Sequence, residues 1–297
     1  MSHADKPTSR FRALLARKTV TLMPGVGDAF SARLCAHEGF ETIMSSGNAG
    51  SAMRIGAPDV GLLTMSENAE NAGRIAAASG LPVFADADTG YGDALSVRRT
   101  VMEFERAGVA AIMIEDQATP KRCGMLDGKK VIPAAAMEMK IKAALDARRD
   151  DDLCIVARTD ARAVEGLEPA IRRAQAYRRA GADVIFVEGP RTLEETRAIA
   201  REVDAPLLYN VTPTGSVPPL DAAALEGIGG YRLLSCSVFA LLAAIPGMRG
   251  FLRALRETGD PAKAGAGAAS MAEYLEILRF SDWQKMEALY TPEAPKT

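Results

Sequence analysis

The sequence predicts a (β/α)8 barrel, and three observations lead to that fold class. Eight short apolar runs alternate with longer amphipathic segments along the chain, as in barrels of about 250 residues. The runs are apolar at nearly every position, which is typical of parallel strands buried on both faces. The amphipathic segments begin at capping residues and end at or near glycines, as helices do.

The expected elements alternate in order. The strands are residues 19–25, 41–47, 81–88, 109–116, 153–160, 182–189, 205–211 and 231–236. The helices between them are residues 28–39, 66–80, 93–108, 133–150, 167–181 and 192–203, and the first three open on the N-cap residues Asp28, Ser66 and Asp93. A doubly wound open sheet is the alternative. It predicts a glycine-rich phosphate loop after the first strand, and "MPGVGDAF" (23–30) matches such a loop only weakly.

Composition excludes several function classes. With 297 residues, 48% of them hydrophobic, the chain can bury a large core. Its 36 basic and 38 acidic residues give a net charge of -2, which is no footprint for nucleic acid or an anionic membrane. The four cysteines are too widely spaced for a disulfide framework or a zinc site. No apolar leader or run of about 20 apolar residues is present, so we expect a cytoplasmic protein.

The pattern changes near residue 257. We expect a catalytic barrel over residues 1–257 and a helical extension over residues 258–297. The segment 259–270 is a connector of small residues, and the segment 271–290 has Leu, Ile, Phe and Trp at the spacing of one or two helices. Periodicity leaves open whether this tail packs on its own barrel or on a neighbouring subunit.

Carboxylates dominate the expected strand ends, where barrel enzymes carry their chemistry. Asp86 and Asp88 lie two residues apart, so on a strand their side chains share one side. They could each cap a turn, but Glu115 and Glu188 end two further strands and favour a shared Mg²⁺. The chain's only histidines are His3 and His37, so a general base must be a carboxylate, lysine, tyrosine, cysteine or water.

One cysteine stands out in "EDQATPKRCGMLDGKK" (115–130). Cys123 follows Lys121 and lies between two basic pairs of this glycine-containing loop, and nearby positive charge lowers the pKa of a thiol. Glycines allow such a loop to move as a lid over the barrel mouth. The other cysteines fall in apolar runs and are expected to be inert.

Four ordered motifs resemble one family. They are "GAPDVGLLT" (56–64), "FADADTGYG" (84–92), "IEDQATPKRCG" (114–124) and "VARTDA" (156–161). Together they resemble the isocitrate lyase / phosphoenolpyruvate mutase superfamily, from about residue 10 to 290. The "KRCG" element is similar to the branch of 2-methylisocitrate lyase and 2,3-dimethylmalate lyase, whereas the phosphonomutases lack that cysteine.

The resemblance implies an Mg²⁺-dependent (Mn²⁺ is the alternative ion) carbon–carbon lyase, an oxo-acid lyase, that cleaves a 2-hydroxy di- or tricarboxylate to pyruvate, or another 2-oxo acid, and a second acid. It implies a homotetramer whose last helices are swapped between subunits. By match to the motifs, the catalytic residues would be Cys123 as general acid, Lys121 and Arg158. The metal residues would be Asp86, Asp88, Glu115 and Glu188, supported by Asp59, and the residues on the substrate would be Ser46, Gly47, Asn48, Arg158 and Asn210.

Three positions depart from the family pattern. Met125 stands where the lyases usually have histidine, Met44 where a tyrosine is common, and Pro213 where a glutamate is common. Each replaces a polar group with an apolar one, so we expect a smaller or more apolar substrate, such as an alkyl-substituted malate. The alternatives are an oxaloacetate hydrolase or decarboxylase, a carboxyphosphonoenolpyruvate phosphonomutase-like enzyme, and a non-catalytic binder of 2-oxo acids.

Overall fold

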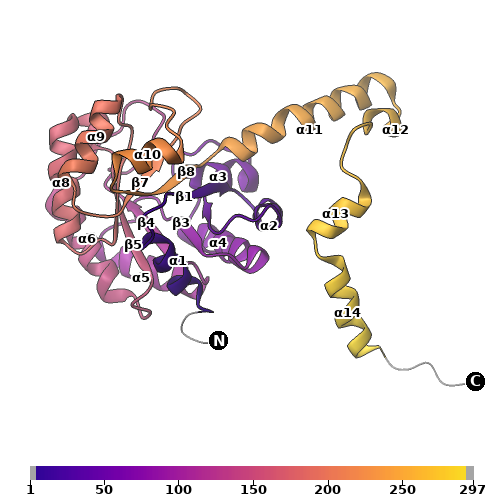
Figure 1. The fold of residues 1–297 in the computed structure, drawn as a ribbon, viewed down its shortest axis with the longest axis horizontal. Helices are drawn as coiled ribbons and strands as arrows, with labels where there is room; N and C mark the ends of the chain where they lie inside the picture. The colour runs from indigo at the N-terminus through magenta and orange to yellow at the C-terminus, as the bar shows by residue number, and fades with distance from the viewer. Residues whose placement is uncertain (1–4, 292–297) are drawn as a thin grey trace, which may run out of the picture. The chain divides into compact units, whose positions relative to one another are not determined.

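The computed structural model describes residues 5–291, and within them eight parallel strands close into a barrel in chain order (Figure 1). The first and last strands complete the ring, with Thr21 paired to Leu233 and Leu22 to Leu234. This confirms the predicted fold class and all eight strands. Their bounds are β1 (Thr21–Val26), β2 (Ile43–Ser45), β3 (Val83–Asp86), β4 (Ala111–Glu115), β5 (Cys154–Thr159), β6 (Val184–Val187), β7 (Leu207–Asn210) and β8 (Tyr231–Cys236).

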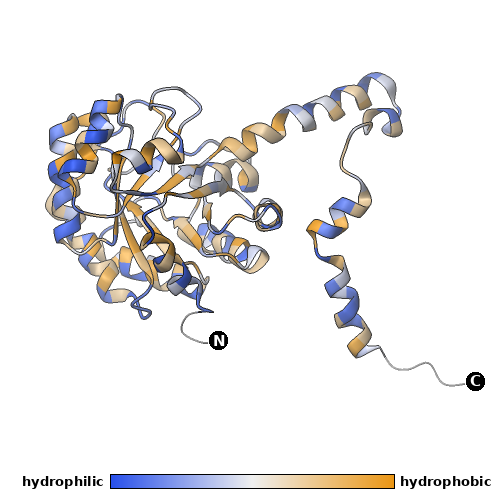
Figure 2. Ribbon diagram, in the orientation of Figure 1, coloured by the Kyte–Doolittle hydropathy of each residue, from blue (hydrophilic) through white to orange (hydrophobic). Residues whose placement is uncertain are grey.

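Helices surround the strands, and each expected helix is present. The helices up to β8 are α1 (Pro7–Leu15), α2 (Ala29–His37), α3 (Gly47–Ile55), α4 (Met65–Ser79), α5 (Ala94–Arg106), α6 (Ala134–Ala147), α7 (Ala161–Val164), α8 (Leu167–Arg179), α9 (Leu193–Glu202) and α10 (Ala222–Ile228). The strands are buried on both faces, and Figure 2 shows them as a hydrophobic centre with polar residues on the outer helices. The inner core holds side chains such as Met23, Phe84 and Met113, and the layer under the helices holds Ile112 and Ile155.

The helix caps agree with the sequence in two of three cases. Asp28 accepts a hydrogen bond from the backbone of Ser31, and Asp93 caps α5. The prediction that Ser66 caps the next helix was wrong, because Thr64 forms a reciprocal capping box with Glu67. The correct signal is the T-x-x-E spacing, because the side chains of Thr64 and Glu67 each accept a hydrogen bond from the other residue's backbone N–H.

Four of the helices up to β8 were not predicted: α1, α3, α7 and α10. In α1, Phe11 packs in the inner core with Phe84, their ring centroids 6.3 Å apart, and Leu14 and Leu15 belong to the same cluster. In α3, Ser46 is the N-cap and accepts a hydrogen bond from the backbone of Ala49. Short helices of mixed composition carry weak periodicity, which explains why the pattern did not reveal them.

The chain divides by compactness between Leu242 and Ala243. Helical structure continues through the tail as α11 (Phe239–Thr258), α12 (Pro261–Ala264), α13 (Met271–Ile277) and α14 (Phe280–Tyr290). The prediction of one or two helices in residues 271–290 is thereby confirmed, whereas the domain boundary at residue 257 stays a prediction. Among residues 5–291, no helix is both long enough and apolar enough to cross a membrane.

Candidate active site

A narrow cavity of about 30 Å³ lies at the carboxyl ends of the strands, beneath the loop that follows β4. We call residues 118–131 the lid, because Gly124 and Met125 from this loop form one wall of the cavity. Such a volume holds little more than a water or two, since one water needs roughly 10–15 Å³. The predicted site residues that line it are Ser46, Asn48, Asp59, Asp86, Cys123, Arg158, Glu188 and Asn210.

Two predicted metal residues stand together at the end of β3. The backbone N–H of Asp88 donates to Asp86 Oδ1 over 3.0 Å, and Asp88 adopts a left-handed backbone with φ of 49°. Gly47 approaches them so closely that a side-chain carbon on it would lie 2.9 Å from Asp86 Oδ2. Glycine at position 47 therefore leaves a recess beside the two carboxylates.

Lys121 is buried against the same acidic pair. Its Nζ lies 2.5 Å from Asp59 Oδ1 and 2.5 Å from Asp88 Oδ1. Burial raises the pKa of Asp88 to about 6, although Lys121 pulls it downward. Burial lowers the pKa of Lys121, but the nearby carboxylates of Asp88, Glu115 and Asp59 raise it more. The pKa of Lys121 is therefore well above its usual value. Lys121 is thus a stable cation.

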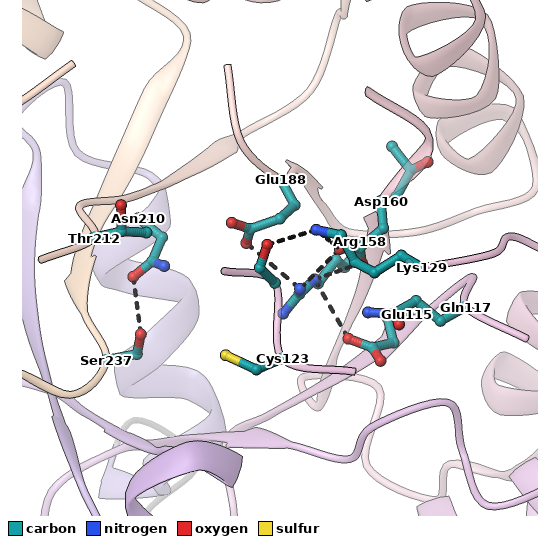
Figure 3. A network of polar contacts seen from close by, with 12 residues as sticks. Glu115, Gln117, Cys123, Lys129, Arg158, Asp160, Glu188, Asn210, Thr212 and Ser237 are labelled. Carbon is teal, nitrogen blue, oxygen red and sulfur yellow. Dashed lines mark hydrogen bonds and ion pairs between the residues drawn. The ribbon is translucent and has the colours of Figure 1, made fainter. Parts of the chain in front are cut away.

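Arg158 is the centre of a second buried charge cluster (Figure 3). It donates two parallel hydrogen bonds to Asp160, Nε to Oδ2 at 2.9 Å and Nη2 to Oδ1 at 3.0 Å. Its Nε lies 3.4 Å from Glu115 Oε2, and its Nη2 lies 3.6 Å from Glu188 Oε2. The guanidinium also lies 5.4 Å from the ring centroid of Phe186. Arg158 is thereby fixed, with Nη1 left for a ligand.

The acidic residues fit a hydrated magnesium ion. Glu115 Oε1 is buried without a hydrogen-bond donor, and Asp88 Oδ1 has only its ion pair with Lys121. Burial raises the pKa of Glu115 well above its usual value although Arg158 and Lys121 lower it, so a further cation would favour the charged carboxylate. Within residues 5–291, no three acidic, histidine or cysteine side chains form a ready-made cage. Mg²⁺ suits such sparse oxygen donors because it keeps several of its waters.

Cys123 is buried in the lid and faces the cavity. Asn48 Nδ2 donates to its Sγ over 3.3 Å, and the Cys123 N–H donates to the Asp59 carbonyl over 3.0 Å. Figure 3 shows the sulfur directed into the space between Arg158 and the pair Asn210–Ser237.

The expectation that neighbouring charge lowers the pKa of Cys123 was wrong. Burial raises that pKa, and the backbone hydrogen bond of Met125 lowers it only in part. The charges are engaged elsewhere, because Lys121 pairs with Asp59 and Asp88, and Lys129 pairs with Asp160. The buried thiol is therefore protonated at neutral pH and suited to donate a proton.

Asn210 is oriented by two serines that sequence analysis did not single out. Ser235 Oγ donates to Asn210 Oδ1 over 2.8 Å, and Ser237 Oγ donates to the same atom over 3.2 Å. The amide oxygen is thereby occupied, so the amide N–H₂ is free to donate to a carboxylate or carbonyl. A serine-rich end of β8 was the available signal.

The remaining predicted residues fall in two groups. Gly47, Asp88, Glu115 and Lys121 are buried but are not among the residues that line the cavity, and the rest line it. Of the three positions that depart from the family pattern, Met44 and Met125 line the cavity. Pro213 is exposed and is not among the lining residues. Phe186, from the middle of β6, was missed because an apolar residue inside a strand gives no distinctive signal.

A parallel barrel with buried carboxylates, one fixed arginine and a thiol on a closed lid defines a class of proteins: barrel enzymes that act on small carboxylates. Comparison with known families specifies it further. Residues 11–256 match the model of phosphoenolpyruvate phosphomutase, and the chain belongs to that family, within the PEP mutase/isocitrate lyase superfamily.

Similar proteins span almost the whole chain. A 2,3-dimethylmalate lyase of Eubacterium barkeri is 38% identical over 95% of this chain and 97% of its own length. A 2-methylisocitrate lyase of Aeropyrum pernix is 41% identical over 96% of this chain and 91% of its own length.

Solved structures agree with this assignment. A 2,3-dimethylmalate lyase structure superposes with a TM-score of 0.90 at 33% identity, covering 97% of both chains. An oxaloacetate acetylhydrolase has a TM-score of 0.89 at 32% identity, covering 96% of this chain and 97% of its own. A phosphonopyruvate hydrolase bound to oxalate and Mg²⁺ has a TM-score of 0.87 at 30% identity, covering 96% and 99%.

Proposed function

We propose that this chain is an Mg²⁺-dependent carbon–carbon lyase. It cleaves a 2-hydroxy carboxylate with an alkyl substituent to a 2-oxo acid, such as pyruvate, and a second carboxylic acid. The observation that carries the proposal is the buried thiol of Cys123, whose pKa burial raises, in the same cavity as Asp86, Glu188 and Arg158. Relatives of 38–41% identity are named as lyases of this kind.

Each residue has a role in that reaction. Asp86, Asp88, Glu115 and Glu188 would hold Mg²⁺ directly or through its waters, and the ion would supply stabilisation of the negative charge that develops on the substrate. The N-terminus of α3, at Ser46, Gly47 and Asn48, receives the carboxylate through backbone N–H groups. Arg158 and the N–H₂ of Asn210 orient the rest of the anion, and Lys121 adds positive charge beside Asp88.

The chemical step transfers two protons and cleaves the C2–C3 bond. A base takes the proton of the 2-hydroxyl, and its O–H electrons form the C=O bond of the 2-oxo product. The C2–C3 electron pair leaves with the second fragment, whose carboxylate delocalises it. Cys123 donates its thiol proton to that carbon and completes the second acid. The closed lid keeps bulk water from competing as the proton donor.

The apolar wall favours an alkyl-substituted malate. Met44, Met125 and Phe186 line the cavity, so three apolar side chains would face a substrate admitted by movement of the lid. A methyl or ethyl substituent gains about 0.8 kcal/mol per buried methylene against such a wall, whereas an extra carboxylate would be desolvated without a partner. Dimethylmalate-like substrates therefore fit better than tricarboxylates.

The C-terminal helices are proposed to be covered by a second copy of the chain, within a homotetramer. Helix α11 has no buried residue, and α13 has only Ile277. Large apolar side chains remain exposed on both α13 and α14. Those on α14 include Trp283, which is 60% exposed, and Leu289, which is 77% exposed. Several large apolar side chains exposed on the same helices favour an interaction site there. A cytoplasmic location remains a prediction.

Oxaloacetate hydrolysis is the second candidate, favoured by the likeness to an oxaloacetate acetylhydrolase structure. Product identity separates the two functions. The test is to incubate the protein and Mg²⁺ with 2,3-dimethylmalate, methylisocitrate, malate and oxaloacetate, and to identify the products. We expect pyruvate and propionate from 2,3-dimethylmalate, and no turnover by Cys123→Ser or with a chelator. Acetate and oxalate from oxaloacetate, without cleavage of the longer acids, would establish the second candidate.

A further inference from the structure

Lys129 is a lysine of the lid that has no role in the mechanism above. Its side chain is buried, with only 4% of its surface exposed. Its Nζ contacts the Gly124 carbonyl at 2.5 Å and Asp160 Oδ1 at 3.1 Å. Lys130 is its sequence neighbour in the same loop, and it is exposed. A lysine ammonium is seldom buried, because its desolvation is costly unless ion pairs and hydrogen bonds compensate.

Backbone pairing joins the two ends of the lid to each other. Ala118 N–H donates to the Lys130 carbonyl over 2.8 Å, and Gln117 forms an isolated antiparallel bridge with Val131. Gln117 also holds the Arg122 backbone through both amide atoms of its side chain. These contacts fix the two ends of the lid, but they do not determine where the turn at residues 123–126 sits above the cavity.

The turn that carries Cys123 is attached to the barrel from two sides. On one side, the Cys123 N–H donates to the Asp59 carbonyl, and Lys121 pairs with Asp59. On the other side, Lys129 connects the Gly124 carbonyl to Asp160. Asp160 is held in turn by the two hydrogen bonds from Arg158 (Figure 3).

We propose that Lys129 is a positioning residue for Cys123. Its ammonium fastens the Gly124 carbonyl to Asp160, and this holds the thiol over the cavity at a fixed depth relative to Arg158. The proposal rests on the role of Cys123 in the proposed function. Losing the contact releases one side of the turn, and a displacement of about 1 Å from the reacting atoms can cost about 100-fold in rate.

The geometry also makes the contact testable without destroying the core. When Lys129 becomes Met, Asp160 keeps its bidentate partner Arg158, so no buried carboxylate is left alone. Met retains the length of the lysine stem and loses only the ammonium. Lys129→Gln offers a second variant, because its amide can still donate to one of the two oxygens but carries no charge.

Two measurements test the position of the lid: the rate at which the Cys123 thiol is alkylated, and the steady-state kinetics of the reaction. The rate of Cys123 modification by iodoacetamide is followed by mass spectrometry of the tryptic peptide, at constant pH, for wild type, Lys129→Met, Lys129→Gln and the control Lys130→Met. We expect a rise of at least tenfold in Lys129→Met, a smaller rise in Lys129→Gln, and the wild-type rate in Lys130→Met. Peptides of the buried Cys35 and Cys154 show whether the fold is intact.

Steady-state kinetics on the substrate found by the product screen provides the second measurement. We expect kcat to fall ten- to hundredfold in Lys129→Met while KM changes less than threefold, because the substrate is bound by the barrel and not by Lys129. A wild-type rate of Cys123 alkylation in Lys129→Met would overturn the proposal. Absence of lyase turnover in the wild type would overturn the proposed function alone, since alkylation does not depend on turnover.

Discussion

Arg158 and Asp160 lie two residues apart on one strand end and share two parallel hydrogen bonds of 2.9 and 3.0 Å. Arg158 lies in β5 and Asp160 directly follows the strand at the N-cap of α7, so the chain itself places both groups together. The pair makes the arginine rigid before any ligand arrives. Asp160 also receives Lys129 from the lid, so one carboxylate orients the arginine and anchors the lid.

Arg158→Lys should disable this arrangement although it keeps the charge. A lysine cannot form the planar two-bond contact, and Asp160, Glu115 and Glu188 would share one point charge. We expect kcat/KM to fall by about 100-fold and the free energy of unfolding to fall by about 3 kcal/mol, as when a buried pair loses a partner. Kinetics and urea unfolding measure both. Arg172→Lys, an exposed arginine that pairs with Glu168 at 3.8 Å, is the control and should change neither.

Gly124→Ala should keep the lid from closing. A side-chain carbon at this position would lie 2.6 Å from Arg158 Nη2 and 2.8 Å from Glu188 Cδ, and both groups are fixed by ion pairs. The lid would have to rise, so we expect faster alkylation of Cys123 and a lower kcat. Gly227→Ala is the control, since nothing lies within 4 Å of the added carbon. Equal alkylation rates in Gly124→Ala and wild type would contradict the closed lid.

The fold could be predicted from sequence because each strand is a short, nearly continuous apolar run and each predicted helix between the strands has an amphipathic pattern bounded by cap signals. The position of Ser66 misled the N-cap prediction, since Thr64 had the better partner in Glu67. Helix α1 escaped because its packing against Phe84 depends on the closed barrel, a long-range property that local periodicity does not contain.

The site was predicted less completely, for a physical reason. Strand-end acids and the lid cysteine are visible in sequence, whereas burial is a product of the whole fold. The pKa of Cys123 shows the difference: neighbouring basic residues suggested a lowered value, but their ammonium groups pair with Asp59, Asp88 and Asp160. The roles assigned to Cys123 and the metal residues stay predictions until they are tested by substitution.

The pH dependence of Cys123 follows from its raised pKa. Because burial disfavours the thiolate, the thiol stays protonated as pH rises past about 8.5, the ordinary value for cysteine. The folded state then binds a proton that the unfolded state has lost, so this group lowers stability only above that pH. Alkylation of Cys123 should be slow at pH 7 and rise above pH 9. A rate already at its plateau by pH 7.5 would show a thiolate and exclude a neutral proton donor.

Removal of Mg²⁺ should lower the melting temperature. An ion that binds only the folded state stabilises it by about 2.7 kcal/mol at 100 times its Kd. We expect added Mg²⁺ to raise Tm at pH 7.5, EDTA to reverse it, and Asp86→Asn to abolish the shift. Glu194→Gln changes an exposed carboxylate on α9 and should leave the shift unchanged. An undiminished shift in Asp86→Asn would place the ion elsewhere.

The tail offers a test of assembly that needs no substrate. Trp283, Met286 and Leu289 follow one another at intervals of three residues on α14, and their side chains are exposed in the single chain. Each would contribute roughly 1.5–3 kcal/mol if fully buried by another copy. We expect a tetramer by light scattering at micromolar concentration, and smaller species for Trp283→Glu combined with Leu289→Glu. The exposed Lys285→Glu on the same helix is the control and should preserve the tetramer. A wild-type protein that is monomeric at these concentrations would refute the covered tail, whereas a monomeric double variant with unchanged circular dichroism would support it.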